Sequence, residues 1–387
     1  MARLEEICSL ITDGSHFSPE DEGVGYPMFS VKDMTPNGFN ISGCKKIGEE
    51  AYKKLVANGC KPLNDDVVVA KDGSYLKTAF VIKGNPEITL LSSIAILRPK
   101  IDLVVPEYLS YFLKSDAVYR TVSLNYITGT ALKRIILKGI RKIEVDLPDI
   151  GEQEQRAQRL SKVDYLCQLR KQQLAKLDEL VKARFVEMFG DPVSNPLHWK
   201  KVKLSELADI KIGPFGSLLH KEDYVTGGHP LVNPSHIING KIIVDNDLTL
   251  TEGKYFELSA YRLKKNDVVL GRRGEMGRCA VVDEDGLLCG TGSLLIRTNG
   301  TVTADYIQKI ISFPTFKKTI EDMAVGQTMP NLNVPIVSNF MIIVPPLSVQ
   351  KDYYDFVECV DQQKQTVQQS LEKLELMKKA LMQEYFG

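Results

Sequence analysis

The sequence predicts a mixed α/β protein of two tandem globular domains and two long helices, which pair as an antiparallel coiled coil with pseudo-two-fold symmetry. Three observations carry this prediction: a long internal repeat, short β-type runs separated by turn residues, and two long segments almost free of Gly and Pro. Short runs of strand-forming residues separated by Gly, Pro and Asn are typical of β-strands. Long segments almost free of Gly and Pro, with apolar residues repeating among polar ones, are typical of helices.

The internal repeat covers most of the chain. The segment 183–190 returns as 380–387, which is 197 positions later, with Ala, Glu, Phe and Gly in the same places. At the same spacing Gln153 returns as Gln350, and Leu147 with Pro148 returns as Val344 with Pro345. A period this long indicates a duplicated globular-plus-helical module rather than a solenoid of short units.

The repeat divides the chain into four segments. Residues 1–150 form the first globular domain, with β-type runs at 66–70, 79–82 and 94–97 and a helix expected over 107–123. Residues 151–196 form a central spacer helix that Gly190 ends. Residues 197–346 repeat the α/β pattern as a second globular domain, and residues 347–387 form a C-terminal spacer helix.

Both long helices carry an apolar seam with alternating spacings of three and four, which favours coiled-coil packing. The residues expected to pack the two helices together are Leu160, Val163, Leu174, Leu177, Val181, Val357, Val360, Val367, Leu371, Leu374 and Leu381. Four seam positions are charged, namely Arg170, Arg184, Lys364 and Lys378. Either these side chains fix the register of the pair, or their long stems carry the charge out to water.

Composition and charge exclude several classes of protein. The chain has 49 basic and 49 acidic residues, which argues against a protein that coats nucleic acid nonspecifically, although 133–142 and 262–278 are locally basic. Seven scattered cysteines without a CxxC pair indicate free thiols in a reducing compartment and no zinc site. No apolar run reaches the length of a transmembrane helix and the first residues are acidic, so a cytoplasmic protein is expected.

Motifs for catalysis are missing from the sequence. There is no GxGxxG or GxxxxGK phosphate loop and no HExxH. Each of the Asn-Pro pairs lacks the second Pro of an amino-methyltransferase site for a flipped base. The triplet 252–254, Glu-Gly-Lys, imitates part of a nuclease metal site, but such triplets are frequent by chance. The residues therefore predict a chain that is not an enzyme.

The order of the Gly-rich motifs is the most specific feature. The second domain has Lys-Ile-Gly-Pro-Phe-Gly at 211–216, Gly-Arg-Arg-Gly-Glu-Met-Gly at 271–277, Gly-Gln-Thr-Met-Pro-Asn-Leu at 326–332 and Pro-Pro at 345–346 before the helix. The first domain has Thr-Asp-Gly-Ser-His at 12–16, Lys-Asp-Gly-Ser at 71–74 and Thr-Gly-Thr-Ala-Leu-Lys at 128–133. In this order, twice over and each time before a long helix, the chain resembles the DNA-specificity subunit of type I restriction–modification systems along essentially its whole length.

The resemblance implies a function without catalysis. Each globular domain would be a target-recognition domain that reads one half of a split, asymmetric sequence in double-stranded DNA. The helices would act as a spacer and dock two methyltransferase subunits, which bind S-adenosylmethionine and methylate adenine. Separate translocase–nuclease subunits would add cleavage, while the specificity subunit itself binds no cofactor.

Candidate DNA contacts are polar side chains on the Gly-containing loops, because Arg and Lys suit guanine, Asn and Gln suit adenine, and Gly lets the backbone approach closely. The candidates are Ser15, His16, Lys71, Ser74, Tyr75, Lys77, Thr130, Lys133, Arg134, Arg272, Arg273, Arg278, Gln327 and Thr328. Arg272, Arg273 and Lys71 are assigned to bases, and Lys133 and Arg134 to phosphates. The alternative for any one of them is a solvated turn residue.

Two other functions stay open at this point. A stand-alone restriction enzyme or methyltransferase would need cofactor motifs that the sequence lacks. A coiled-coil adaptor that binds only proteins would not need duplicated α/β domains with Arg- and Gly-rich loops.

Overall fold

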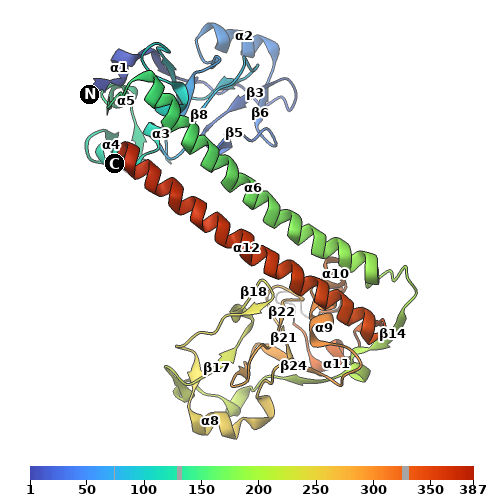
Figure 1. The fold of residues 1–387 in the computed structure, drawn as a ribbon. Helices are drawn as coiled ribbons and strands as arrows, with labels where there is room; N and C mark the ends of the chain where they lie inside the picture. Colours follow the sequence, from blue (N-terminus) through green and yellow to red (C-terminus); the bar gives the residue numbers. More distant parts are fainter. Residues whose placement is uncertain (74, 129–132, 325–330) are drawn as a thin grey trace. The chain divides into compact units, whose positions relative to one another are not determined.

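The computed structural model describes all residues except 74, 129–132 and 325–330 (Figure 1). The chain forms two compact units. The first unit contains Met1–Gln173 and Val367–Gly387, and the second contains Leu174–Thr366. Each long helix therefore contributes one part to each unit.

The first unit is built around a four-stranded antiparallel sheet in the order β2-β10-β7-β8. A smaller sheet, β6-β3-β9, lies beside it and includes the parallel pair β3–β9. The strands are β1 (Ala2–Arg3), β2 (Cys8–Asp13), β3 (Tyr26–Phe29), β4 (Met34–Thr35), β5 (Gly38–Phe39), β6 (Lys45–Ile47), β7 (Val67–Ala70), β8 (Ala79–Val81), β9 (Thr89–Leu90), β10 (Ile94–Pro99), β11 (Ile127–Thr128), β12 (Arg134–Ile135) and β13 (Glu144–Val145). The short helices are α1 (Leu4–Ile7), α2 (Glu49–Ala57), α3 (Pro106–Leu113), α4 (Asp116–Asn125) and α5 (Leu137–Arg141).

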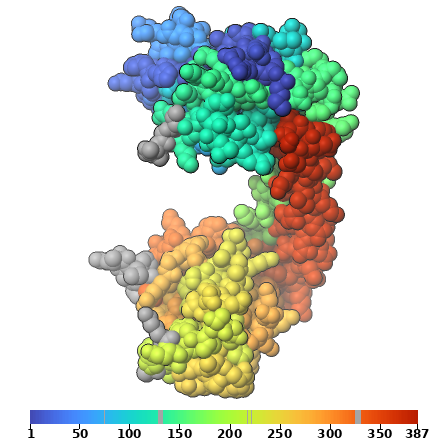
Figure 2. Space-filling view, turned by 90° about the vertical axis from the view of Figure 1, so that its left-hand side faces the viewer, coloured from blue at the N-terminus to red at the C-terminus, as the bar shows by residue number. Residues whose placement is uncertain are grey.

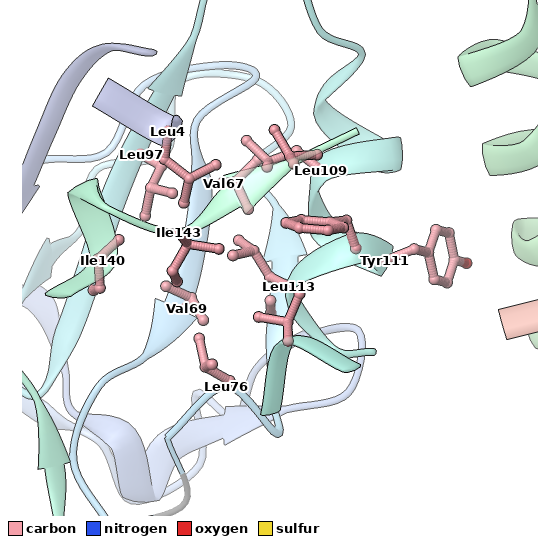
Figure 3. Packing of buried hydrophobic residues seen from close by; sticks show 14 of the residues in the cluster. Leu4, Val67, Val69, Leu76, Leu97, Leu109, Tyr111, Leu113, Ile140 and Ile143 are labelled. Atoms are coloured by element: carbon pink, nitrogen blue, oxygen red, sulfur yellow. The ribbon is translucent and has the colours of Figure 1, made fainter. Parts of the chain in front are cut away.

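The central strands of this sheet are buried on both faces, which explains their continuous apolar runs. Because side chains alternate along a strand, Val67 and Val69 of β7 join the cluster under α3 and α5, whereas Val68 joins a second cluster with Phe29 and Phe80. Figure 3 shows the first cluster, in which Leu4, Val67, Leu97, Leu109 and Ile143 converge from different elements.

The single helix expected over 107–123 is wrong. The structure has two helices, α3 and α4, because Ser115 caps α4 by accepting a hydrogen bond from the Val118 amide at 3.3 Å. A side-chain acceptor at this position favours a helix start over helix continuation.

The second unit repeats the first. Its four-stranded sheet has the order β15-β24-β21-β22, which matches β2-β10-β7-β8 strand for strand, and its pair β17–β23 is parallel like β3–β9. The strands are β14 (Lys200–Lys203), β15 (Ala208–Ile212), β16 (Tyr224–Val225), β17 (His229–Val232), β18 (Ile237–Ile238), β19 (Lys241–Ile242), β20 (Thr249–Leu250), β21 (Val268–Gly271), β22 (Cys279–Val281), β23 (Leu288–Cys289), β24 (Ser293–Thr298) and β25 (Met341–Val344). The short helices are α7 (Leu204–Leu207), α8 (Glu252–Glu257), α9 (Ala304–Ile311), α10 (Pro314–Met323) and α11 (Val334–Ser338).

The long helices are α6 (Ile150–Phe189) and α12 (Leu347–Phe386). At the start of α6 the Asp149 carboxylate accepts a hydrogen bond from the Glu152 amide at 3.0 Å, which satisfies one free donor of the first turn. At its end Gly190 adopts a φ of 75°, a left-handed conformation that suits Gly and stops the helix.

Within each unit α6 and α12 pack side by side in opposite directions (Figure 1). In the first unit Arg156 donates to the Tyr385 carbonyl at 3.3 Å, and further along α6 Arg170 donates to Ser370 at 3.2 Å. In the second unit the Tyr353 hydroxyl donates to the Val181 carbonyl at 3.3 Å. The antiparallel pairing expected from the sequence is confirmed.

A repeated aromatic residue anchors each helix end to its unit. Phe386 of α12 lies 5.2 Å from Tyr108 of α3, and Phe189 of α6 lies 5.1 Å from Tyr306 of α9, measured between ring centroids. Both phenylalanines are buried. This packing gives a physical reason for the repeated Phe-Gly at 189–190 and 386–387.

Among the described residues, no helix is both long and apolar enough to cross a membrane.

Candidate nucleic-acid interface

In each unit the two predicted loops come together at the same edge of the main sheet. In the first unit the turn after β7 meets the segment leading into β12: the Gly73 amide donates to the Lys133 carbonyl at 2.8 Å, and the Ile135 amide donates to the Lys71 carbonyl at 3.0 Å. In the second unit the Leu332 amide donates to the Arg272 carbonyl at 2.9 Å. Residues about sixty positions apart in the sequence therefore form one surface per unit, as a loop-based site requires.

Lys71 does not present its charge to solvent. It is buried, and its ammonium forms an ion pair with the carboxylate of Asp13 at the end of β2. His16 also approaches Asp13, at 3.5 Å. This position speaks against the assignment of Lys71 to a base contact, because the carboxylate of Asp13, 58 positions earlier in the chain, neutralises its charge.

Two more candidates of the first unit serve the structure of their own loop. The Ser15 hydroxyl donates to the Phe17 carbonyl at 2.6 Å and is buried. Tyr75 is buried as well, with its hydroxyl 3.1 Å from that of Ser123 and its ring stacked on Tyr119 of α4. Their side chains therefore stabilise the loop rather than face a ligand.

The accessible polar candidates of the first unit are His16, Lys77, Lys133 and Arg134. All four are exposed, and the Lys77 ammonium lies 5.8 Å from the centre of the Tyr119 ring. Arg134 approaches Asp72 at 3.9 Å. Their positions leave the prediction of phosphate contacts by Lys133 and Arg134 in place.

The second unit presents two adjacent arginines on the turn after β21. Arg272 is half-buried and donates from Nε to the Leu332 carbonyl at 3.1 Å, whereas Arg273 is exposed. Burial, and then the neighbouring charge of Arg273, lower the pKa of Arg272. A pocket of about 360 Å³ opens beside them, lined by Ile212, Phe215, Arg272, Arg273, Thr291 and Gly292.

Arg278 belongs to a separate cluster. Its guanidinium pairs with Glu275 at 3.0 Å, and Lys317 pairs with the same carboxylate at 2.8 Å. Hydrogen bonds from Lys317 and then Arg278 lower the pKa of Glu275. Part of the charge of Arg278 is thus neutralised within the turn.

The remaining candidates, Ser74, Thr130, Gln327 and Thr328, lie outside the described residues. In the part of the chain that the structure describes, no three His, Cys, Asp or Glu side chains gather into a metal site.

Comparison with known proteins decides the family. The family described as the type I restriction modification DNA specificity domain matches residues 1–179 and, a second time, residues 196–376. This chain belongs to that family. It is a type I specificity subunit, the component of a restriction–modification complex that recognises DNA and is not itself catalytic.

Individual specificity subunits are similar over most of the chain. The MjaVIII type I restriction enzyme specificity subunit of Methanocaldococcus jannaschii is 23% identical, covering 85% of this chain and 79% of that protein. The putative MjaX specificity subunit of the same organism is 21% identical, covering 98% and 90%.

Solved structures share the fold. The type I S subunit from M. genitalium superimposes with a TM-score of 0.56 at 16% identity, covering all of this chain and 95% of that one. A chain from a study of complex assembly and conformational transition in a type I restriction–modification system gives a TM-score of 0.61 at 17% identity, covering 100% and 96%.

In the spacer helices of this specificity subunit, every residue expected at the helix seam is at least partly shielded from solvent. Leu160, Val163, Leu177, Val181, Val360, Val367 and Leu371 are buried, and Leu174, Val357, Leu374 and Leu381 are half-buried. Among the charged seam residues, Lys378 pairs with Asp164 at 2.6 Å and Lys364 with Asp178 at 2.7 Å, each across the helix pair. These contacts favour the view that the seam charges help to set the register.

Sequence reasoning missed the residues that fasten the spacer to the globular parts. The Gln153 side chain accepts from the Val105 amide at 3.0 Å and donates to the Pro148 carbonyl at 2.9 Å. Gln350 makes the same pair of bonds, with the Thr303 amide at 3.0 Å and the Pro345 carbonyl at 2.9 Å. The recurrence of Gln at these two positions was the available signal.

Proposed function

We propose that this specificity subunit reads a bipartite, asymmetric target in double-stranded DNA, with one block read by each globular domain. The observation that supports the proposal is the loop pair, which recurs at the same sheet edge in both units but carries different side chains. Equivalent loops with different polar groups suit two different short sequences, because direct readout depends on the donors and acceptors presented to the groove.

The proposal includes two methyltransferase subunits docked on the spacer, one for each half of the repeat. Large apolar side chains remain exposed on both long helices. They are Tyr165, Leu169, Leu376 and Met377 in the first unit and Leu180, Val186 and Leu347 in the second. Figure 2 shows that the surface of α12 is uncovered on the side turned to the viewer. Exposed apolar patches of this kind mark protein-interaction surfaces.

The chemistry would be supplied by the partners. The methyltransferase subunits would bind S-adenosylmethionine and methylate adenine, and translocase–nuclease subunits would add cleavage. The complex would act in the cytoplasm, where it meets the DNA.

Methylation mapping tests the proposal. The chain is co-expressed with its methyltransferase, and methylated adenines are located across host DNA by single-molecule sequencing. We expect one motif of two short defined blocks around a fixed gap. A stable complex that methylates nothing would contradict the proposal and favour a protein-only adaptor.

Docking is tested separately on α12. The double substitution Leu376→Lys and Met377→Lys places two charges on the exposed apolar surface, and we expect the number of bound methyltransferase subunits to fall when the complex is weighed. The control, Leu376→Met with Met377→Leu, keeps the apolar area. Equal stoichiometry for both variants would remove this surface from the docking site.

A further inference from the structure

The two units differ in charge at one equivalent position of their DNA-reading loops. In the first unit Asp13 ends β2 opposite Ala95 of β10, and in the second unit Ile212 ends β15 opposite Leu294 of β24. The cations that follow the neighbouring strands, Lys71 after β7 and Arg272 after β21, occupy matching places as well. The repeat therefore allows a residue-by-residue comparison.

In the first unit the charges of Asp13 and Lys71 neutralise each other. Lys71 pairs with Asp13, and both side chains are only 10% exposed. The next residue is itself an acid: Asp72 forms a β-bridge with Arg134 and approaches its guanidinium at 3.9 Å. Lys71 and Asp72 therefore each have an opposite charge beside them.

In the second unit neither carboxylate is present. Ile212 takes the place of Asp13, and Arg273 takes the place of Asp72, since it forms a β-bridge with Asn331 where Asp72 forms one with Arg134. Among the described residues neither Arg272 nor Arg273 takes part in an ion pair, and positions 74, 129–132 and 325–330 include no acid. Two adjacent guanidinium groups thus share one site without a counter-charge, which is unfavourable until an anion or an electron-rich acceptor binds.

The pocket beside these arginines has the form of a ligand site. Its apolar side is Ile212 and the exposed Phe215, and its polar side is the arginine pair with Thr291 and Gly292. Arg272 is held through its Nε by the Leu332 carbonyl, and its terminal nitrogens make no hydrogen bond to the residues that the structure describes. A guanidinium anchored in this way can donate two parallel hydrogen bonds to one ligand.

We infer that the Arg272–Arg273 pocket binds an electron-rich acceptor group of the DNA, either the O6/N7 edge of a guanine or a backbone phosphate, and that the matching position of the first unit is closed to such a group. The inference rests on the proposed function and specifies how one of its two recognition sites works. It predicts that the second domain binds its half of the target with an uncompensated positive charge at this position, whereas the first domain does not.

The test uses the full chain in complex with its methyltransferase and two independent variants. Arg273→Ala removes an exposed charge, and Ile212→Asp restores the carboxylate that the first unit has. Each is expected to weaken binding to a duplex containing the mapped target by about 5- to 150-fold. Lys265→Ala is the charge-matched control, because Lys265 is exposed and precedes β21, at the end of the strand opposite to Arg272.

The readouts separate the two acceptors. A guanine contact predicts that one position of a single block relaxes in the methylation motif of Arg273→Ala. A phosphate contact predicts an unchanged motif, equal weakening on all sequences, and a salt dependence of binding reduced by about one phosphate contact. Either result supports the inference. Motif, affinity and salt dependence that match the wild type in both variants would overturn it, whereas a wild-type complex that binds no duplex would contradict the proposed function instead.

Discussion

A buried acid–base pair holds the central sheet in each unit. Arg98 donates two hydrogen bonds of 2.8 Å to Asp66, and Arg297 donates bonds of 2.8 and 2.7 Å to Asp267. Both aspartates are almost fully buried. Asp267 also accepts the Lys264 amide at 2.7 Å, so it fixes the turn that leads into β21.

Removal of either aspartate should destabilise its own unit. Asp267→Ala leaves a partly buried guanidinium and a backbone amide without their acceptor, and we expect a loss of about 2–4 kcal/mol in the free energy of unfolding. Urea denaturation measures it, with the exposed Asp102→Ala as a control expected to stay within about 0.5 kcal/mol of wild type. Equal stability of the two variants would contradict a structural role for the pair.

Lys114 in the first unit should make the stability of the protein depend on pH. Its ammonium lies 4.5 Å from the centre of the Tyr111 ring. Burial, and then the charge of Lys378, lower the pKa of Lys114 to about 8, while Asp164 opposes the shift. Between this pKa and the ordinary lysine pKa of 10.5 the unfolded chain binds more protons than the folded one, so the free energy of unfolding should rise with pH.

The matching experiment compares wild type with Lys114→Met in urea at pH 7.5, 8.5 and 9.5. The variant has no proton to lose at this position, so the wild type should gain stability relative to it as the pH rises. Parallel pH profiles would show that Lys114 titrates alike in the folded and unfolded chains.

At the scale of elements, a single glutamine joins each long helix to its globular part. Gln350→Leu leaves the Thr303 amide and the Pro345 carbonyl without their partner, at a cost of about 1–3 kcal/mol for each group that stays buried. We expect faster hydrogen exchange at the Thr303 amide. The control is Gln362→Leu, at an exposed position of the same helix. Unchanged protection of the Thr303 amide in Gln350→Leu would contradict the proposed role of Gln350 in joining the helix to the globular part.

The elements also show how far sequence reasoning reaches. Both long helices were predictable, because their seams and stop signals are local, and so were β7, β8 and β10 from their apolar runs. The break at Ser115 was missed because one capping hydroxyl decided it. The buried state of Lys71 was missed because it depends on Asp13, and nothing in the sequence near Lys71 indicates that β2 and β7 flank β10 and end at the same edge of the sheet.

At the scale of the whole molecule, the repeat predicts that the two recognition domains are exchangeable. When residues 1–150 are replaced by the same domain of another specificity subunit, one block of the methylation motif should change while the other block stays the same. The gap should also be kept, because the spacer helices are unaltered. Methylation mapping of the chimera measures this, and the reciprocal exchange of 197–346 is its control. A change in both blocks would contradict independent reading.

The location of Phe386 in the core of the first unit affects how the protein is made. The ribosome completes 174–366, a continuous stretch, before it synthesises the residues 381–386 that cover Tyr108 and Phe112. The half translated later can therefore finish folding first, while the earlier half waits with an incomplete core, the reverse of the usual order from the N-terminus. A chaperone that protects this nascent chain would find its apolar target in the part that left the ribosome first.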